Sequence, residues 1–368
     1  MMLSHTQFPR IPIDRPHPDV RRLIRVLLGQ ERTPRPPMVE FLIDPFVRQS
    51  IVTGLLGREW VDDPLADRRA STAYWDNYIA CWHQLGYDYV RLEADLLLPI
   101  HTTDAPDVTA GSQQIRHWRN RHLGMIASWD DFERYPWPRV EEHDFFPFEY
   151  INSHLPDGMG LMVSHATGVF ESLTDTFSTE GLCYALYDQP DLVHAVCQRM
   201  GQLMEQYNEH LLDLDRVVAL FPGDDLGFRT GTLIAPDQLR LYVLPWHKRF
   251  AAQAHAHGVP YFLHSCGNVE AIMPDLIEGG IDAKHSFEDA IMPVTEFHAR
   301  YADRIASLGG IDVDVLTRGT SDDVRARVRA TIEACAPRGR YAIGSGNSIP
   351  SYVPVENYLA MLDEAQIS

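Results

Sequence analysis

The stretch YFLHSCGN, residues 261–268, joins a short apolar run to two residues that often bind metals. Its first three residues are large and apolar, as in a buried strand, and His264 and Cys266 stand at the C-terminal end. Because side chains alternate along a strand, residues two apart project from the same face. Imidazole nitrogen and thiolate sulfur are ligands that zinc prefers. The stretch therefore predicts a metal site at a strand end, although His and Cys also occur together in ordinary cores.

Seven other runs have the composition of short strands, and most are separated by segments with helical periodicity. Together with the first run they are residues 38–43, 87–92, 160–164, 217–221, 261–263, 282–284, 305–308 and 340–343. The clearest helical segment, residues 191–212, carries its large apolar side chains on one face. Strand alternating with helix eight times is the pattern of a (β/α)8, or TIM, barrel. The competing fold, a doubly wound sheet, is disfavoured because no strand precedes a G-x-G-x-x-G or P-loop motif.

Two segments fall outside this alternation. Residues 1–37 contain seven prolines and are interpreted as an N-terminal extension to a single barrel domain, residues 38–368. Within the extension, apolar residues at helical spacing from Val20 to Leu28, followed by Gly29, predict a lead-in helix. Residues 98–156, after the second strand, are polar and aromatic. We interpret them as a helical insertion that forms a lid or wall at the barrel mouth, with an oligomer contact as the alternative.

Composition excludes several classes of protein. The net charge of −19 disfavours nucleic acid and anionic membrane surfaces as partners, because both repel an acidic protein. No apolar run approaches the roughly 18 residues of a membrane span, and residues 1–18 lack the apolar core of a signal peptide. The five cysteines form no C-x-x-C pair and no disulfide framework. We therefore expect an acidic cytoplasmic enzyme.

Polar and ionisable residues stand at the C-terminal ends of the predicted strands. In a barrel these ends meet at one mouth, where the chemistry takes place. Besides His264 and Cys266, the residues at these ends include Arg91, Glu93, His165, Asp225, His285, Asp312 and Asn347. So many ionisable groups on one face are not needed for stability alone, so their convergence predicts an active site.

Each of these residues also has a structural interpretation. Asp225 is a preferred N-cap residue for a helix, and Arg91 and Glu93 can form an internal ion pair. His285 can donate a ring N–H to a carboxylate without contacting a metal. Asp312 follows two glycines and suits a turn, although Gly-Gly also lets a ligand approach the backbone closely. The sequence leaves both interpretations open.

Four stretches of the C-terminal half carry a resemblance to a known family. They are PGDDLGFRTG (222–231), HSCGNVEAIMPDLIEGGIDA (264–283), LGGIDVDVLTRGTSDDV (308–324) and IPSYVPVENYLAML (349–362). In order and spacing they resemble the uroporphyrinogen decarboxylase superfamily, and its zinc-dependent, cobalamin-related methyltransferases more than its decarboxylases. The resemblance implies a (β/α)8 barrel with its site at the C-terminal mouth. It also implies a zinc ion held by His264, Cys266 and a later Cys, which activates a thiol for methyl transfer.

The sequence departs from both branches at informative positions. The third ligand of the methyltransferases, a Cys, is replaced by Asn347 in GSGNSIP. The remaining candidates for a third ligand are His285, Asp225 and Glu93, of which a histidine at the next strand end is chemically the best. The decarboxylases carry an arginine-rich segment after the first strand, whereas this chain reads VEFLIDPFVRQS there. An acidic enzyme would also repel a substrate with eight carboxylates.

These observations favour a zinc-dependent methyltransferase that activates a thiol or another small nucleophile. The expected metal ligands are His264, Cys266 and His285, and Asp225 and Glu93 are the expected catalytic residues. The expected substrate-binding residues are His165, Arg91, Asp312 and Asn347. The expected methyl donor is either a corrinoid (cobalamin) carried by a partner protein or a small molecule. The expected assembly is a homodimer. The alternatives are a decarboxylase or lyase for a small carboxylated substrate and a barrel that binds a corrinoid or tetrapyrrole without turnover.

Overall fold

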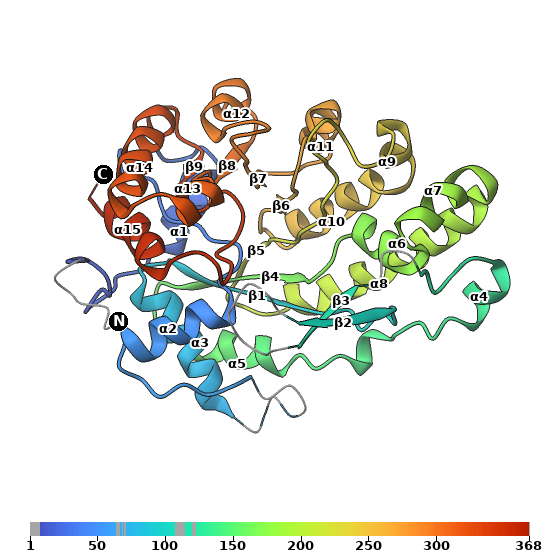
Figure 1. Ribbon diagram of the computed structural model, residues 1–368, viewed down its shortest axis with the longest axis horizontal. Coiled ribbons are helices and arrows are strands. Elements are labelled where there is room, and N and C mark those ends of the chain that lie inside the picture. Colours follow the sequence, from blue (N-terminus) through green and yellow to red (C-terminus); the bar gives the residue numbers. More distant parts are fainter. Residues whose placement is uncertain are drawn as a thin grey trace.

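The protein is described by a computed structural model that covers residues 8–63, 67, 69, 71–106, 115–119 and 123–367. Parallel strands form its centre and helices surround them (Figure 1). After residues 38–43, the barrel strands are β1 (Tyr89–Ala94), β4 (Gly160–His165), β5 (Val217–Leu220), β6 (Phe262–His264), β7 (Ala283–His285), β8 (Ala306–Leu308) and β9 (Tyr341–Ala342). The alternation of strand and helix predicted from the sequence, and with it the (β/α)8 barrel, is confirmed.

The strands pair in chain order around the barrel. β1 pairs with β4 and β4 with β5, while β6, β7, β8 and β9 form a second continuous sheet. Isolated parallel bridges, one of them between Gly223 and His264, join β5 to β6. Further bridges join residues 38–43 to the chain at and after β9, at Met38 and Ile43. The C-terminal ends of the strands therefore lie at one end of the barrel.

The first predicted strand, residues 38–43, is bridged only at its two ends. Among the described residues, no backbone ladder joins it to β1 on its other side, and side chains make this connection instead. The Tyr89 hydroxyl accepts a hydrogen bond from the Glu40 amide and donates one to the Glu40 carbonyl, both at 2.7 Å. Arg91 donates to the Phe41 carbonyl at 3.0 Å. We call this side-chain connection between residues 38–43 and β1 the seam.

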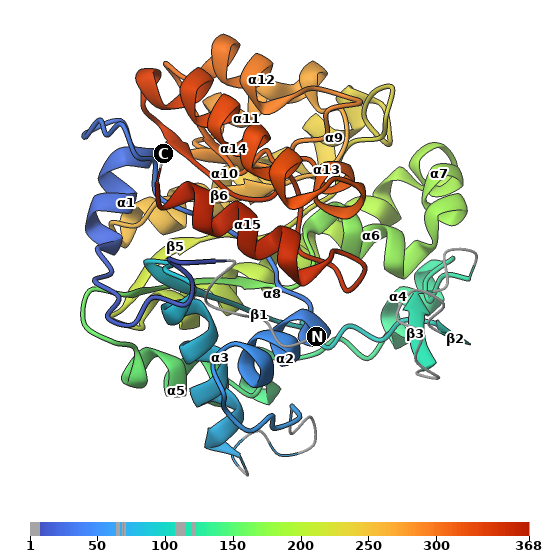
Figure 2. The same cartoon turned by 60° about the vertical axis from the view of Figure 1, so that its left-hand side comes forward.

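Helices follow most of the strands and cover the barrel from outside (Figures 1 and 2). None of those in the described part of the chain is long and apolar enough to cross a membrane. The principal helices are α2 (Pro45–Gly54), α3 (Thr72–Gln84), α6 (Val169–Phe177), α7 (Thr179–Asp188), α8 (Pro190–Leu212), α9 (Pro236–Tyr242), α10 (Leu244–Ala256), α11 (Met273–Glu278), α12 (Val294–Tyr301), α13 (Val313–Arg318), α14 (Ser321–Cys335) and α15 (Val355–Ala365).

The lead-in helix is present as α1 (Val20–Leu27), capped by the Asp19 side chain, and it ends before Gly29, whose φ is +72°. The insertion after the second strand contains the helices α4 (Trp129–Arg134) and α5 (Phe146–His154). It also contains an antiparallel hairpin, β2 (Thr102–Pro106) with β3 (Ile115–Arg119), which the expectation of helices alone did not include. Figure 2 shows the hairpin and α4 on the side of the molecule that also carries α6 and α7.

The Arg91 side chain is buried inside the barrel, with 1% of the residue's surface exposed. Its guanidinium donates to the carbonyls of Phe41 and Phe221, at 3.0 and 2.9 Å, and to the Ser164 hydroxyl at 3.2 Å. It also pairs with Glu93 at 2.6 Å and lies 3.5 Å above the centre of the Phe41 ring. One side chain therefore holds together the seam, β4 and the end of β5.

We expect the substitution Arg91→Met to destabilise the fold by about 3–5 kcal/mol, because it leaves buried acceptors and Glu93 without their donor. Urea unfolding measures this loss. The matched control is Arg249→Met, since Arg249 is half exposed, pairs with Glu205 and lies over Trp246. The control should lose less than about 1 kcal/mol. Equal losses in the two variants would contradict the structural role of Arg91.

Candidate metal centre

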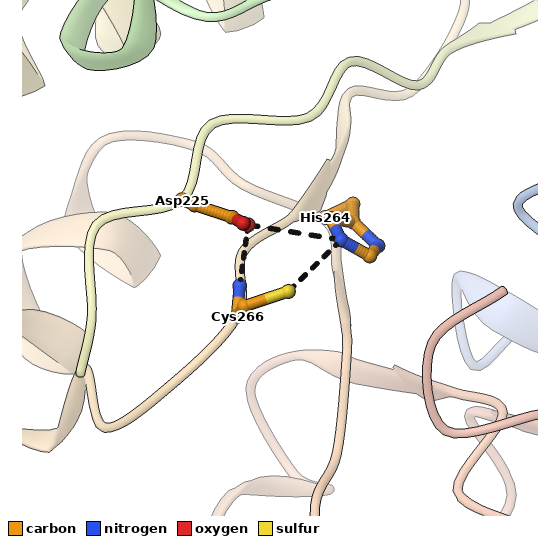
Figure 3. A group of neighbouring side chains, drawn as sticks. All are labelled: Asp225, His264 and Cys266. Carbon is orange, nitrogen blue, oxygen red and sulfur yellow. Dashed lines mark hydrogen bonds and ion pairs between the residues drawn. The ribbon is translucent and has the colours of Figure 1, made fainter. Parts of the chain in front are cut away.

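The candidate site lies at the C-terminal ends of β5 and β6. His264 ends β6, Cys266 follows in the next loop, and Asp225 lies in the loop after β5 (Figure 3). The His264 Nε2 atom is 3.3 Å from the Cys266 Sγ atom and 3.8 Å from the Asp225 Oδ1 atom. One ligand atom from each of these residues lies within 4.8 Å of the others. The three residues form what we call the O,N,S cluster.

Two glycines let the loops that carry the O,N,S cluster approach each other. Gly267 has a φ of +77°, which a residue with a side chain rarely adopts. A Cβ atom on Gly227 would lie 2.7 Å from backbone atoms of the Cys266–Asn268 turn. The Cys266 amide donates to Asp225 Oδ1 at 2.9 Å, and this bond fixes the carboxylate beside the thiol. The backbone of the two loops therefore sets the spacing of the donors.

The geometry and chemistry of the cluster fit a zinc ion. Bonds of about 2.0–2.3 Å in a tetrahedral site place the donor atoms about 3.3–3.8 Å apart. The two distances from His264 Nε2 fall in this range. One imidazole, one thiolate and one carboxylate also form a donor set that zinc accepts, with a fourth position left for a substrate. These three residues could therefore hold a catalytic zinc ion.

Burial controls the protonation of the metal-free cluster. Burial and, to a smaller extent, the neighbouring Asp225 carboxylate raise the pKa of Cys266 to about 12. Burial also lowers the pKa of His264 well below its ordinary value. Without a cation the cysteine is a thiol and the imidazole is neutral. The cluster therefore lacks the positive charge that a thiolate requires, and a bound metal ion is a group that supplies it.

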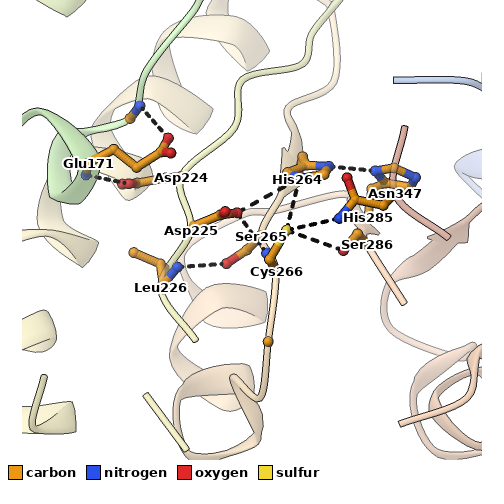
Figure 4. A network of polar contacts seen from close by, with 12 residues as sticks. Glu171, Asp224, Asp225, Leu226, His264, Ser265, Cys266, His285, Ser286 and Asn347 are labelled. Atoms are coloured by element: carbon orange, nitrogen blue, oxygen red, sulfur yellow. Dashed lines mark hydrogen bonds and ion pairs between the residues drawn. The ribbon is translucent and has the colours of Figure 1, made fainter. Parts of the chain in front are cut away.

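His285, the expected third metal ligand, does not join the O,N,S cluster. It lies opposite His264 in the β6–β7 register and contacts the far side of that ring, with the two Nδ1 atoms 2.7 Å apart (Figure 4). Its Nε2 atom is 3.2 Å from the Ser345 carbonyl oxygen. Both of its nitrogens are thus engaged by the protein. The third residue of the cluster is Asp225.

Asn347, which stands where the resemblance implies a cysteine, contacts the sulfur directly. Its Nδ2 atom donates to Cys266 Sγ at 3.2 Å, and the Ser286 hydroxyl lies at 3.7 Å from the same atom (Figure 4). Two donors therefore face the sulfur. This arrangement is suited to a thiolate, because hydrogen bonds to sulfur disperse its negative charge.

The other predicted site residues lie further from the cluster. Arg91 and Glu93 form the internal ion pair described above, and Arg91 offers no exposed surface to a substrate. His165 is 1% exposed and its Nδ1 atom donates to the Thr167 carbonyl, at 2.6 Å. Asp312 caps α13 and also accepts a hydrogen bond from the Asp289 amide. Their roles in binding substrate stay predictions.

The site residues predicted from the sequence did not include three residues that lie around the site. Phe41 stacks on the His264 ring with the centroids 4.0 Å apart. Asp224 is fully buried, caps the first turn of α6 and contacts His247 at 2.9 Å. Glu40 is fully buried beside Ser345. A glutamate inside the apolar run MVEFLI was a usable signal for Glu40, whereas the stacking of Phe41 required the three-dimensional structure.

A cavity of about 290 Å³ opens beside Asp225, between α6, α7 and residues 227–234. Much of its wall is apolar, with Phe170, Leu182, Phe228 and Leu233 among the lining residues. A second cavity, of about 570 Å³, adjoins Asn347. The first cavity is thus lined by a residue of the O,N,S cluster, and the second by a residue that contacts the sulfur of the cluster.

Comparison with known proteins identifies the family. A profile described as uroporphyrinogen decarboxylase (URO-D) matches residues 78–367. The chain belongs to the uroporphyrinogen decarboxylase family. The resemblance seen in the four C-terminal stretches is thereby confirmed, and the family match extends through β1 as well.

Two methyltransferases of Methanosarcina mazei are similar to this member of the uroporphyrinogen decarboxylase family. The methylated-thiol–coenzyme M methyltransferase is 26% identical over 212 residues, which cover 55% of this chain and 52% of the relative. The match therefore spans about half the length of that curated relative. A solved methyltransferase structure from the same organism superposes with a TM-score of 0.67 at 17% identity and covers 94% of this chain and 97% of its own. This likeness shows the fold.

Proposed function

We propose that this protein is a zinc-dependent methyltransferase that activates a small thiol for methyl transfer. The observation that carries the proposal is the O,N,S cluster at the C-terminal mouth of the barrel, with donor spacing that suits zinc. Membership in the uroporphyrinogen decarboxylase family and the similarity to a methylated-thiol methyltransferase support the reaction class.

The residues of the chain have distinct roles in this proposal. His264, Cys266 and Asp225 hold the ion, which when bound lowers the pKa of a thiol so that a thiolate exists at neutral pH. Asn347 and Ser286 donate to the Cys266 sulfur and orient it. The Cys266 amide keeps Asp225 turned toward the cluster.

The cavity beside Asp225 is the proposed substrate pocket. It shares Asp225 with the cluster, and its wall includes the apolar side chains of Phe170, Leu182 and Leu233. A small methylated compound or thiol would bury its carbon atoms there while its sulfur faces the cluster. A corrinoid, free or on a partner protein, is the proposed methyl donor. Exclusion of water by this wall favours attack by the thiolate over hydrolysis.

The carboxy-lyase alternative has less support from the basic residues. A small carboxylated substrate needs an accessible cation, for which Arg91, Arg229 and Lys284 are the candidates. Arg91 is buried and bonded as described above. The Lys284 ammonium is also buried, and it donates to the carbonyls of Ser286 at 2.5 Å and Ser265 at 3.4 Å. Of these three side chains, Arg229 alone is exposed.

The test combines elemental analysis with a transfer assay. We expect about one zinc ion per chain. We also expect methylation of a small thiol by methylcobalamin, which the visible spectrum of the corrinoid monitors. Protein stripped by a chelator should lose the transfer and recover it with added zinc. Zinc-free protein that releases carbon dioxide from a carboxylated substrate and methylates no thiol would overturn the proposal.

We expect the substitution Asn347→Cys to tighten zinc binding by at least about tenfold, the order of effect seen for changes close to metal ligands. The new thiol would stand where an amide nitrogen already lies 3.2 Å from Cys266 Sγ. Chelator competition under reducing conditions measures the affinity. Ser348→Cys is the control, because it adds a thiol one residue further along. An equal gain in both variants would contradict the placement of residue 347.

A further inference from the structure

The far side of the His264 ring makes a contact that metal binding by itself does not require. His264 Nδ1 and His285 Nδ1 lie 2.7 Å apart, and His285 is fully buried (Figure 4). At this distance the two nitrogens share a single hydrogen atom. The ring that carries that hydrogen decides whether the Nε2 atom of His264, which faces Cys266 and Asp225, is bare or protonated.

The hydrogen bond on the other side of the His285 ring shows which ring carries the shared hydrogen. His285 Nε2 lies 3.2 Å from the Ser345 carbonyl oxygen, and a carbonyl oxygen only accepts hydrogen bonds. His285 therefore carries its hydrogen on Nε2. Its Nδ1 is then bare, because a second hydrogen would make it a fully buried cation next to the buried Lys284 side chain. It follows that His264 carries its hydrogen on Nδ1 and presents a bare Nε2 to the O,N,S cluster.

We propose that His285 is a positioning residue that sets the tautomer of His264, so that the lone pair of His264 Nε2 always faces the cation. The inference rests on the proposed function, because it assigns His264 Nε2 as a metal ligand. The hydrogen-bonded series Ser345 carbonyl, His285 and His264 is called the relay below. A ligand histidine fixed in this way needs no change of tautomer when the metal binds.

Two further features hold the relay in place. Ser345 is anchored by Glu40, which accepts bonds from the Ser345 hydroxyl at 2.7 Å and the Ser345 amide at 3.4 Å. Gly309, with a φ of +81°, leaves the space in which the bond between His285 and Ser345 forms. A Cβ atom there would lie 2.0 Å from the Ser345 carbonyl oxygen and 3.1 Å from His285 Nε2. The absence of a side chain at Gly309 therefore makes room for the hydrogen bond between His285 Nε2 and the Ser345 carbonyl.

The tautomers can be read in the metal-free protein from ring-nitrogen NMR spectra, with signals assigned by single-site variants. We expect His264 to be protonated on Nδ1 and His285 on Nε2. His285→Leu removes the acceptor and should mix the His264 tautomers and weaken zinc binding about 10–100-fold. His285→Gln should restore much of the single His264 tautomer and of the zinc affinity, because the glutamine amide can accept a hydrogen bond from His264 and donate one to the Ser345 carbonyl. His298→Gln is the control, as His298 is equally buried and bonds to Ser307 outside the relay.

The outcomes separate this inference from the proposed function. A bare Nδ1 on His264 in the metal-free protein, or unchanged His264 tautomers in His285→Leu, overturns the relay. Equal loss of zinc affinity in His298→Gln also overturns it, since the effect would then follow from packing. Expected tautomers in a protein that methylates no thiol would leave the relay standing and refute the proposed function instead.

Discussion

Cys266→Ala is expected to abolish zinc binding and methyl transfer together. Cys266 is the single sulfur donor of the O,N,S cluster, and its partners His264 and Asp225 cannot hold zinc at the same strength without it. Structural zinc sites contribute about 10–16 kcal/mol through four ligands, so an even share of about 2.5–4 kcal/mol per ligand corresponds to a loss of affinity of about 100–1,000-fold. Chelator competition and the thiol methylation assay measure the two effects.

Cys335→Ala is the matched control for this experiment. Cys335 is fully buried in α14 and belongs to the core, so its replacement costs packing energy without touching the cluster. This variant should keep its zinc and its activity per folded molecule. Stoichiometric zinc in Cys266→Ala, or loss of zinc in Cys335→Ala, would refute the assignment of the sulfur ligand.

Glu40→Gln is expected to remove a large part of the pH dependence of stability. Burial raises the pKa of Glu40 from 4.5 to about 8, although hydrogen bonds from Ser345 and Phe41 oppose the rise. Because the folded state binds this proton more tightly, its contribution is fully present below pH 4.5 and is lost as the pH rises through 8. The rise corresponds to at most about 5 kcal/mol of folding free energy. A glutamine side chain is neutral at every pH, so the Glu40→Gln variant does not lose this contribution to the folding free energy as the pH rises.

The measurement is urea unfolding at a series of pH values between about 4.5 and 9, which brackets the titration. The wild-type protein should lose several kcal/mol more than Glu40→Gln across this range, with most of the difference accumulated by about pH 8. Glu141→Gln changes an exposed carboxylate and serves as the control, whose pH profile should follow that of the wild type. Parallel profiles for wild type and Glu40→Gln would show that Glu40 is not the group that titrates.

The barrel and the pairing of His264 with Cys266 were predictable because they depend on local periodicity. Strand and helix alternate in the sequence, and residues two apart at a strand end share a face. The position of His285 was not predictable in this way. The parallel register places it opposite His264, and whether two neighbouring imidazoles both face a metal or contact each other depends on the Ser345 carbonyl behind them.

Arg91 and the insertion illustrate two other limits. An arginine at a strand end suggests a substrate ligand, yet the carbonyls of Phe41 and Phe221 come from distant parts of the chain and bind it inside the barrel. The hairpin β2–β3 lies in a segment whose aromatic and polar composition resembled that of surface helices. Its strands pair residues 102–106 with residues 115–119, and the composition of the segment does not encode this pairing.

The seam has a mechanical consequence. Separating two strands that share backbone hydrogen bonds breaks the whole ladder between them. Residues 38–43 and β1 are instead connected by hydrogen bonds of the Tyr89 and Arg91 side chains. We therefore expect the barrel wall to open more readily at the seam than between strands that share a backbone ladder. Phe41 sits on that line and its ring lies flat against His264. A movement of residues 38–43 at the seam would therefore displace the aromatic ring that packs against the His264 imidazole.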